Sequence, residues 1–159
     1  IEYNYSLLAK KCGIDMPETR LFEGKYFGVE RFDRSDLGKI HTISAAGLLN
    51  ANYREPSLDY ESLLQACHVL TKNMEEVVKL FRIMVFNVAI QNRDDHAKNF
   101  AFRMNAQRHW KLAPCFDLTY SQGPGGEHQM DVCGEGLNIQ RSHVMQLAQT
   151  LKVGLDQNM

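Results

Sequence analysis

The apolar segment over residues 74–90 constrains the fold of this 159-residue chain more than any other feature. Its Val, Leu, Ile, Met and Phe residues would cover nearly every face of a helix. A helix that is apolar on all sides is buried, and at this length it is a core helix and not a membrane span. We therefore expect one hydrophobic core around it, with the polar segment at residues 91–99 delivered from its C-terminal end.

Composition narrows the class of protein. A hydrophobic content of 44% over this length suits one buried domain. The 18 Lys+Arg against 19 Asp+Glu residues give no general electrostatic reason to bind nucleic acid or a membrane, so we expect neither. No signal-like segment opens the chain, which favours a cytoplasmic location. The four cysteines are widely spaced, which predicts reduced, core-type thiols and no zinc or disulfide framework.

The remaining pattern predicts an α+β, mainly α-helical domain with short β-hairpins. We expect helices over residues 3–12, 58–70 and 142–151, the first ended by Gly13 and the last capped by Ser142 or its neighbour. Strands are predicted over residues 19–22, 26–32, 100–104 and 110–112. Residues 33–38 are predicted to be charged and flexible, and residues 50–57 to form a loop.

Three polar residues after the buried helix have a spacing that suits phosphoryl transfer. Asp94 is followed five residues later by Asn99, and Asp117 comes 23 residues after Asp94. Protein kinases place a base and two magnesium ligands around ATP with a similar pattern. A carboxylate can accept the proton of the substrate hydroxyl, and magnesium prefers oxygen ligands. An acidic turn alone is usually a solvated connection, but the combined spacing favours a catalytic site.

The sequence around these residues resembles the HipA family of bacterial serine/threonine kinases, which are toxins of toxin–antitoxin pairs. Such proteins carry a run like Asn-x-Asp-x-His-Ala-Lys-Asn, present here at residues 92–99, and a later Pro-x-x-Asp, present here at 114–117. Further similarity lies in Val-Glu-Arg-Phe-Asp-Arg at residues 29–34 and Gly-Glu-Gly at 134–136. The resemblance therefore covers most of the chain. In protein kinases a His-Arg pair precedes the catalytic Asp, and of that pair only the arginine matches here, at Arg93.

The resemblance implies roles for individual positions. Asp94 would be the catalytic base, and Asn99 and Asp117 would hold Mg²⁺. His96 and Lys98 would face the ATP phosphates, and Phe116 joins the nucleotide-binding set although its aromatic ring could equally belong to the core. Val29, Glu30 and Arg31 would form the hinge, whose backbone groups pair with adenine. An ion-pair network of Arg31, Asp33 and Arg34 is expected beside it, and Asp95 receives no catalytic role.

The same resemblance implies a division into two parts. Residues 1–34 would be the hinge and a remnant of the N-terminal lobe, and residues 35–159 the HipA-like C-terminal kinase lobe. No Gly-rich loop precedes a strand lysine in this sequence, and Gly123 to Gly126 lies downstream of Asp117. We therefore expect a part of a kinase that is inactive without its N-lobe. ATP, a protein substrate and an antitoxin are its expected partners.

Two other functions remain open. A non-catalytic module could dock an antitoxin or a DNA-binding partner, and upstream residues with a lysine-bearing strand would argue against it. A metal-dependent phosphohydrolase could use Asp94, Asp95, His96 and His68, although the usual His-Asp order is reversed. A preference for manganese or zinc without nucleotide would favour the hydrolase.

Overall fold

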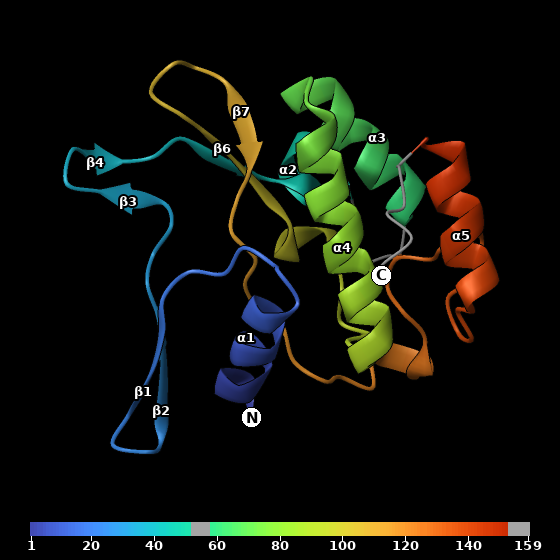
Figure 1. Cartoon of the computed structure of the whole chain (residues 1–159), viewed down its shortest axis with the longest axis horizontal. Coiled ribbons are helices and arrows are strands. Elements are labelled where there is room, and N and C mark those ends of the chain that lie inside the picture. Colours follow the sequence, from blue (N-terminus) through green and yellow to red (C-terminus); the bar gives the residue numbers. More distant parts are fainter. Residues whose placement is uncertain (52–57, 153–159) are drawn as a thin grey trace.

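The computed structural model describes residues 1–51 and 58–152. It has the α+β, mainly helical fold that the sequence predicts. Helices α3, α4 and α5 gather on one side of the molecule, and the β-hairpins extend from the other (Figure 1). The helices are α1 (Glu2–Lys11), α2 (Ala45–Leu48), α3 (Tyr60–Thr71), α4 (Met74–Ile90) and α5 (Arg141–Thr150), with 3₁₀ turns η1 (Ala97–Asn99) and η2 (Pro124–Gly126).

Helix α4 is the central element of the core, as predicted. Asn73 caps its start by accepting a hydrogen bond from the backbone N–H of Glu75 at 2.9 Å. Its buried apolar residues pack with those of α3 in one cluster, and burying each such side chain stabilises the fold by roughly 1.5–3 kcal/mol. Gln91 ends the helix in the left-handed conformation with a φ of 54°. The chain therefore turns sharply into the polar segment at residues 91–99.

The main sheet is antiparallel and has the order β5 (Thr42–Ser44), β6 (Ala101–Met104) and β7 (Trp110–Leu112). A buried carboxylate joins it to α4, because Glu76 accepts a hydrogen bond from the backbone N–H of Leu112 at 2.9 Å. The other oxygen of Glu76 pairs with Lys79 at 2.7 Å. This contact fixes the strand that leads directly to residues 113–117.

The remaining strands form two hairpins, β1 (Thr19–Phe22) with β2 (Tyr26–Val29) and β3 (Arg34–Ser35) with β4 (Gly38–Lys39). The first was predicted, although β2 ends at Val29 and not at residue 32. The prediction of a flexible segment over residues 33–38 was wrong, because Asp33 fixes its start. The carboxylate of Asp33 accepts hydrogen bonds from Arg31 at 2.8 and 2.7 Å and from Arg34 at 2.7 Å, which confirms the expected ion-pair network.

Some short elements differ from the sequence expectation. Strand β5 and helix α2, which Ser44 caps, were not predicted. Helix α5 begins at Arg141, and its N-cap is Gln140, whose backbone N–H donates to His143 Nδ1 at 3.1 Å. Most of the predicted loop at residues 50–57 lies outside the described residues. All four cysteines are free, and Cys12 is exposed, contrary to the core placement expected of it.

Candidate active site

Two adjacent aspartates in the loop after α4 lie in opposite environments. Asp94 has a half-exposed side chain, with 49% of its surface accessible. Asp95 is fully buried. A buried carboxylate is costly unless hydrogen-bond donors surround it. The loop therefore offers the first carboxylate to solvent and uses the second as an internal anchor.

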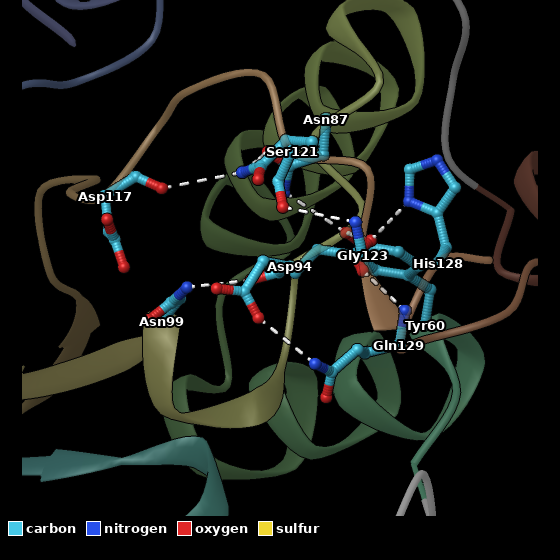
Figure 2. A network of polar contacts seen from close by, with 11 residues as sticks. Tyr60, Asn87, Asp94, Asn99, Asp117, Ser121, Gly123, His128 and Gln129 are labelled. Atoms are coloured by element: carbon cyan, nitrogen blue, oxygen red, sulfur yellow. Dashed lines mark hydrogen bonds and ion pairs between the residues drawn. The ribbon is translucent and has the colours of Figure 1, made fainter. Parts of the chain in front are cut away.

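Three donors satisfy Asp95. The hydroxyl of Tyr60 on α3 donates to it at 2.7 Å, His128 Nδ1 lies 2.8 Å away, and the backbone N–H of Gln129 donates at 2.9 Å. Because a carboxylate only accepts, the His128 nitrogen that faces it carries the proton. Burial, followed by the charge of Asp95, raises the pKa of Tyr60 well above its usual value. The phenol therefore remains a neutral donor, and the anchor joins α3, the loop at residues 91–99 and residues 128–129 (Figure 2).

A chain of hydrogen bonds leads from this anchor to the segment after β7. Asn87 on α4 donates to the Tyr60 hydroxyl at 3.2 Å and accepts from Asn92 Nδ2 at 3.0 Å. The same Asn92 nitrogen lies 3.5 Å from the backbone oxygen of Asp117. Asn87 and Asn92 are both buried. The chain connects the backbone of Asp117 to the loop that carries Asp94 through buried polar groups.

The side chain of Asn99 is bonded to the backbone of Asp94 within the same loop. Its Nδ2 donates to the backbone oxygen of Asp94 at 2.9 Å, so its amide oxygen is turned the other way. His96 lies beside them, with Nε2 3.9 Å from Asp94 Oδ1. Its Nδ1 is buried and has no hydrogen-bond partner among the described residues. Lys98 lies on η1, between His96 and Asn99 in the sequence, and is exposed.

Asp117 is exposed and adopts the left-handed conformation with a φ of 57°, which aspartate tolerates better than most residues. Its carboxylate makes no hydrogen bond with any described residue. Figure 2 shows the Asn99 side chain turned to Asp94, and the backbone oxygen of Asp117 turned to the polar network with its carboxylate directed away from it. Asp94 and Asn99 are therefore in contact, and Asp117 is linked to their loop through its backbone.

The predicted hinge reaches this region through an aromatic contact. Phe116 stacks on Phe32, with ring centroids 5.4 Å apart and ring planes inclined by 27°. Val29 and Glu30 line an open cavity of about 390 Å³ together with Glu18, Arg20, Phe22 and Gly28. The side chain of Arg31 is turned to Asp33 and is 65% exposed. Of the three predicted hinge residues, Val29 and Glu30 thus lie beside this cavity, and Arg31 is not among its lining residues.

Sequence reasoning missed the residues that hold the site in place. Asp95 received no role, and Tyr60, His128 and Gln129 were not singled out. The adjacent pair Asp94-Asp95 was the available signal, because two neighbouring carboxylates seldom share one environment, and one of them could have been expected to be buried. The partners of Asp95 lie 33 to 35 residues away along the chain, so local spacing could not reveal them.

The geometry does not support the residue set suggested for a phosphohydrolase. Asp95 is buried and already accepts three hydrogen bonds, and it faces the interior and not Asp94. Within residues 1–51 and 58–152, no group of three or more His, Cys, Asp or Glu side chains is arranged to hold a metal ion.

In the same part of the chain, no helix has the length and hydrophobicity needed to cross a bilayer.

The chain is similar in sequence to curated proteins that are named as putative kinases. A protein from Haemophilus influenzae named "Putative kinase" is 28% identical over 129 residues, covering 70% of this chain and 38% of its own length. "Putative kinase Y4mE" from Sinorhizobium fredii is 31% identical over 125 residues, covering 70% and 30% respectively. The chain thus spans about a third of the length of these curated relatives.

A solved structure shares the fold. It is the HipA, HipB and operator DNA complex of the Shewanella oneidensis MR-1 toxin–antitoxin system, and the match has a TM-score of 0.80 at 17% sequence identity. It covers 96% of this chain and 43% of the matched chain. The family model described as the HipA-like C-terminal domain matches residues 1–159. The chain therefore belongs to the family of HipA-like C-terminal domains.

Proposed function

We propose that this chain supplies the catalytic loop and the metal ligands of a HipA-type protein serine/threonine kinase. The reaction is transfer of the γ-phosphoryl group of ATP to a serine or threonine hydroxyl of a protein. Relatives that are named as kinases, and membership of the HipA-like family, support the reaction class. The division at residue 34 into an N-lobe remnant and a C-terminal lobe stays a prediction.

One observation carries the proposal. The buried hydrogen-bond chain from Asp95 through Tyr60, Asn87 and Asn92 fixes the backbones of Asp94 and Asp117 in one rigid frame. Phosphoryl transfer depends mainly on the positioning of groups and on electrostatic stabilisation, and less on covalent chemistry by the protein. A frame that leaves the Asp94 carboxylate half-exposed and the Asp117 carboxylate exposed suits this demand.

The oxygen atoms of Asn99 and Asp117 fit a magnesium ion. Asn99 uses its nitrogen on the Asp94 backbone, which leaves its oxygen available, and the Asp117 carboxylate is exposed. Magnesium takes one or two protein oxygens and keeps several waters, so two ligands suffice. Asn99 and Asp117 would hold the ion, which would supply positive charge to neutralise the charge that develops on the ATP phosphates.

The other residues take roles that follow from their places. Asp94 accepts the proton of the attacking hydroxyl, for which its half-exposed carboxylate is available. His96 and Lys98, on the same loop, face the phosphates. The backbone of Val29, Glu30 and Arg31 pairs with adenine, with Val29 and Glu30 at the cavity beside β2. Phe116, which stacks on Phe32 two residues after Glu30, joins the nucleotide-binding set.

The biological setting is part of the proposal. The matched Shewanella structure contains HipA together with HipB and operator DNA, which supports an antitoxin as a partner of the protein that carries this chain. We infer a toxin that acts in the cytoplasm on a protein substrate. The net charge of the chain, which is −1, gives no electrostatic reason for it to bind DNA directly.

Radiolabelled ATP tests the function directly. The complete natural polypeptide that carries this chain is incubated with γ-labelled ATP and a generic protein substrate, with and without magnesium. We expect magnesium-dependent label on serine or threonine. Release of free phosphate without labelled protein would indicate a hydrolase, and the absence of both products would indicate an interaction module.

A further inference from the structure

Gln129 contacts both aspartates of the catalytic loop. Its backbone N–H donates to Asp95 Oδ1 at 2.9 Å, and its side-chain Nε2 donates to Asp94 Oδ1 at 3.1 Å. Figure 2 shows the Gln129 side chain directed at the Asp94 carboxylate. The family motifs at residues 92–99 and 114–117 do not include this position, and the proposed mechanism does not use it.

The backbone of Gln129 is held firmly in this place. The neighbouring His128 has a side chain that is 5% exposed and lies 2.8 Å from the fully buried Asp95 carboxylate. The backbone N–H of His128 also donates to the oxygen of Gly136 at 2.9 Å. The side-chain amide of Gln129 therefore projects from a fixed backbone toward a half-exposed carboxylate that could otherwise rotate.

We propose that Gln129 is the positioning residue of Asp94. Its amide N–H holds Oδ1 of the carboxylate, which leaves Oδ2 to accept the proton of the substrate hydroxyl. The proposal rests on the proposed function, in which Asp94 is the base. A carboxylate without this bond would spend much of its time in other orientations, and a displacement of about 1 Å in a catalytic group can reduce the rate by about 100-fold.

Two substitutions distinguish positioning from space filling. Gln129→Met keeps the length of the side chain and removes the donor. Gln129→Glu keeps the shape and replaces the donor with an acceptor that repels Asp94 when ionised. If Gln129 only filled space, the glutamate variant would retain activity. Gln65→Met is the matched control, because the Gln65 amide bonds Glu61 at 3.3 Å on the exposed surface of α3.

The complete polypeptide is assayed for kcat, for the KM of ATP and for its thermal unfolding midpoint. We expect both Gln129 variants to lose about 10- to 100-fold in kcat, with the KM of ATP and the unfolding midpoint unchanged. Gln65→Met should match the wild type. Normal kcat in either Gln129 variant would overturn the proposal.

A crystal structure of Gln129→Met gives a readout that does not depend on activity. We expect the Asp94 carboxylate to rotate or to occupy several positions, and a carboxylate that keeps its place would overturn the proposal even if kcat falls. Asp94→Asn distinguishes a failure of the proposed function from a failure of the positioning role. If that variant retains transfer, the proposed function fails, whereas its inactivity together with normal Gln129→Met activity refutes the positioning role alone.

Discussion

At the scale of single residues, Asp94 and Asp95 divide two tasks between identical side chains. The carboxylate of Asp95 is buried and accepts three hydrogen bonds, so it stabilises the loop. The carboxylate of Asp94 is half-exposed, and the contacts described above, from His96 and Gln129, are to its Oδ1. The environment, and not the residue type, assigns these roles.

This division predicts a large stability effect at Asp95. Asp95→Ala leaves the Tyr60 hydroxyl, His128 Nδ1 and the Gln129 N–H without their acceptor in a buried place, and should reduce the free energy of unfolding by about 3–5 kcal/mol. Urea unfolding followed by circular dichroism measures it. Asp94→Ala is the control and should cost less than about 1 kcal/mol. Equal losses in the two variants would refute the anchor role.

Asp117 should matter more for nucleotide than for folding. Asp117→Ala removes an exposed carboxylate, so the expected loss of stability is limited to the cost of alanine in the left-handed conformation, about 1 kcal/mol. Titration calorimetry with ATP, with and without magnesium, should show that the mutant of the complete polypeptide has lost the magnesium-dependent part of binding. Asp36→Ala, at the exposed turn between β3 and β4, is the control. Wild-type magnesium dependence in Asp117→Ala would place the metal elsewhere.

At the scale of elements, the segment from Ser121 to Gln129 is packed along the loop at residues 91–99. Ser121 forms a parallel bridge with Asn92 and accepts a hydrogen bond from the backbone N–H of Arg93 at 3.2 Å. Gly123 approaches the same loop so closely that an added Cβ would lie 2.7 Å from Arg93 Cβ and 2.7 Å from the backbone oxygen of Glu127. Residues that follow Asp117 in sequence thus support the loop that precedes it.

This close approach predicts different effects for two neighbouring glycines. Gly123 has a φ of 65° and a ψ of 163°, a region used almost only by glycine, so Gly123→Ala should cost roughly 1–3 kcal/mol in strain alone and displace the loop at Arg93. Gly125→Ala also has a positive φ, but nothing lies within 4 Å of the added Cβ, so it should cost about 1 kcal/mol. Chemical denaturation compares them, and equal costs would contradict the packing described.

Local pattern was sufficient for some elements and not for others. The 17 residues of α4 could be predicted because their apolar content and the capping Asn73 are both local signals. Strand β5 was missed because three residues carry too little pattern, and its pairing with β6 decides its conformation. The spacing of Asp94 and Asn99 is visible in the sequence and predicts a site there. The contact of Gln129 with Asp94 could not be predicted, because it joins residues 35 positions apart.

At the scale of the whole molecule, α3 and α4 form a core on which the candidate site stands without help from the hairpins. Buried residues of both helices, of β6 and β7 and of α5 belong to one hydrophobic cluster. The hinge hairpin β1–β2 is largely exposed by comparison. We therefore expect the core and the candidate site to fold independently of the β1–β2 hairpin, which leads to the predicted hinge.

That separation predicts the behaviour of the 159-residue chain by itself. It should unfold cooperatively and yet transfer no phosphate, because its sequence holds no Gly-rich loop before a strand lysine to orient the β- and γ-phosphates. Thermal unfolding and phosphate incorporation with magnesium and ATP test both parts, with the complete polypeptide as the control. Robust turnover by the 159 residues alone would show a complete active site.

The most direct test of the central claim is phosphoryl transfer by Asp94→Asn in the complete polypeptide, measured with radiolabelled ATP beside the control Asp36→Asn. The amide keeps the shape of the side chain and removes the base, so we expect unchanged thermal stability and a loss of transfer of about two to four orders of magnitude. Asp36→Asn should retain full activity. Near-normal transfer by Asp94→Asn would contradict the assignment of this loop as the catalytic centre.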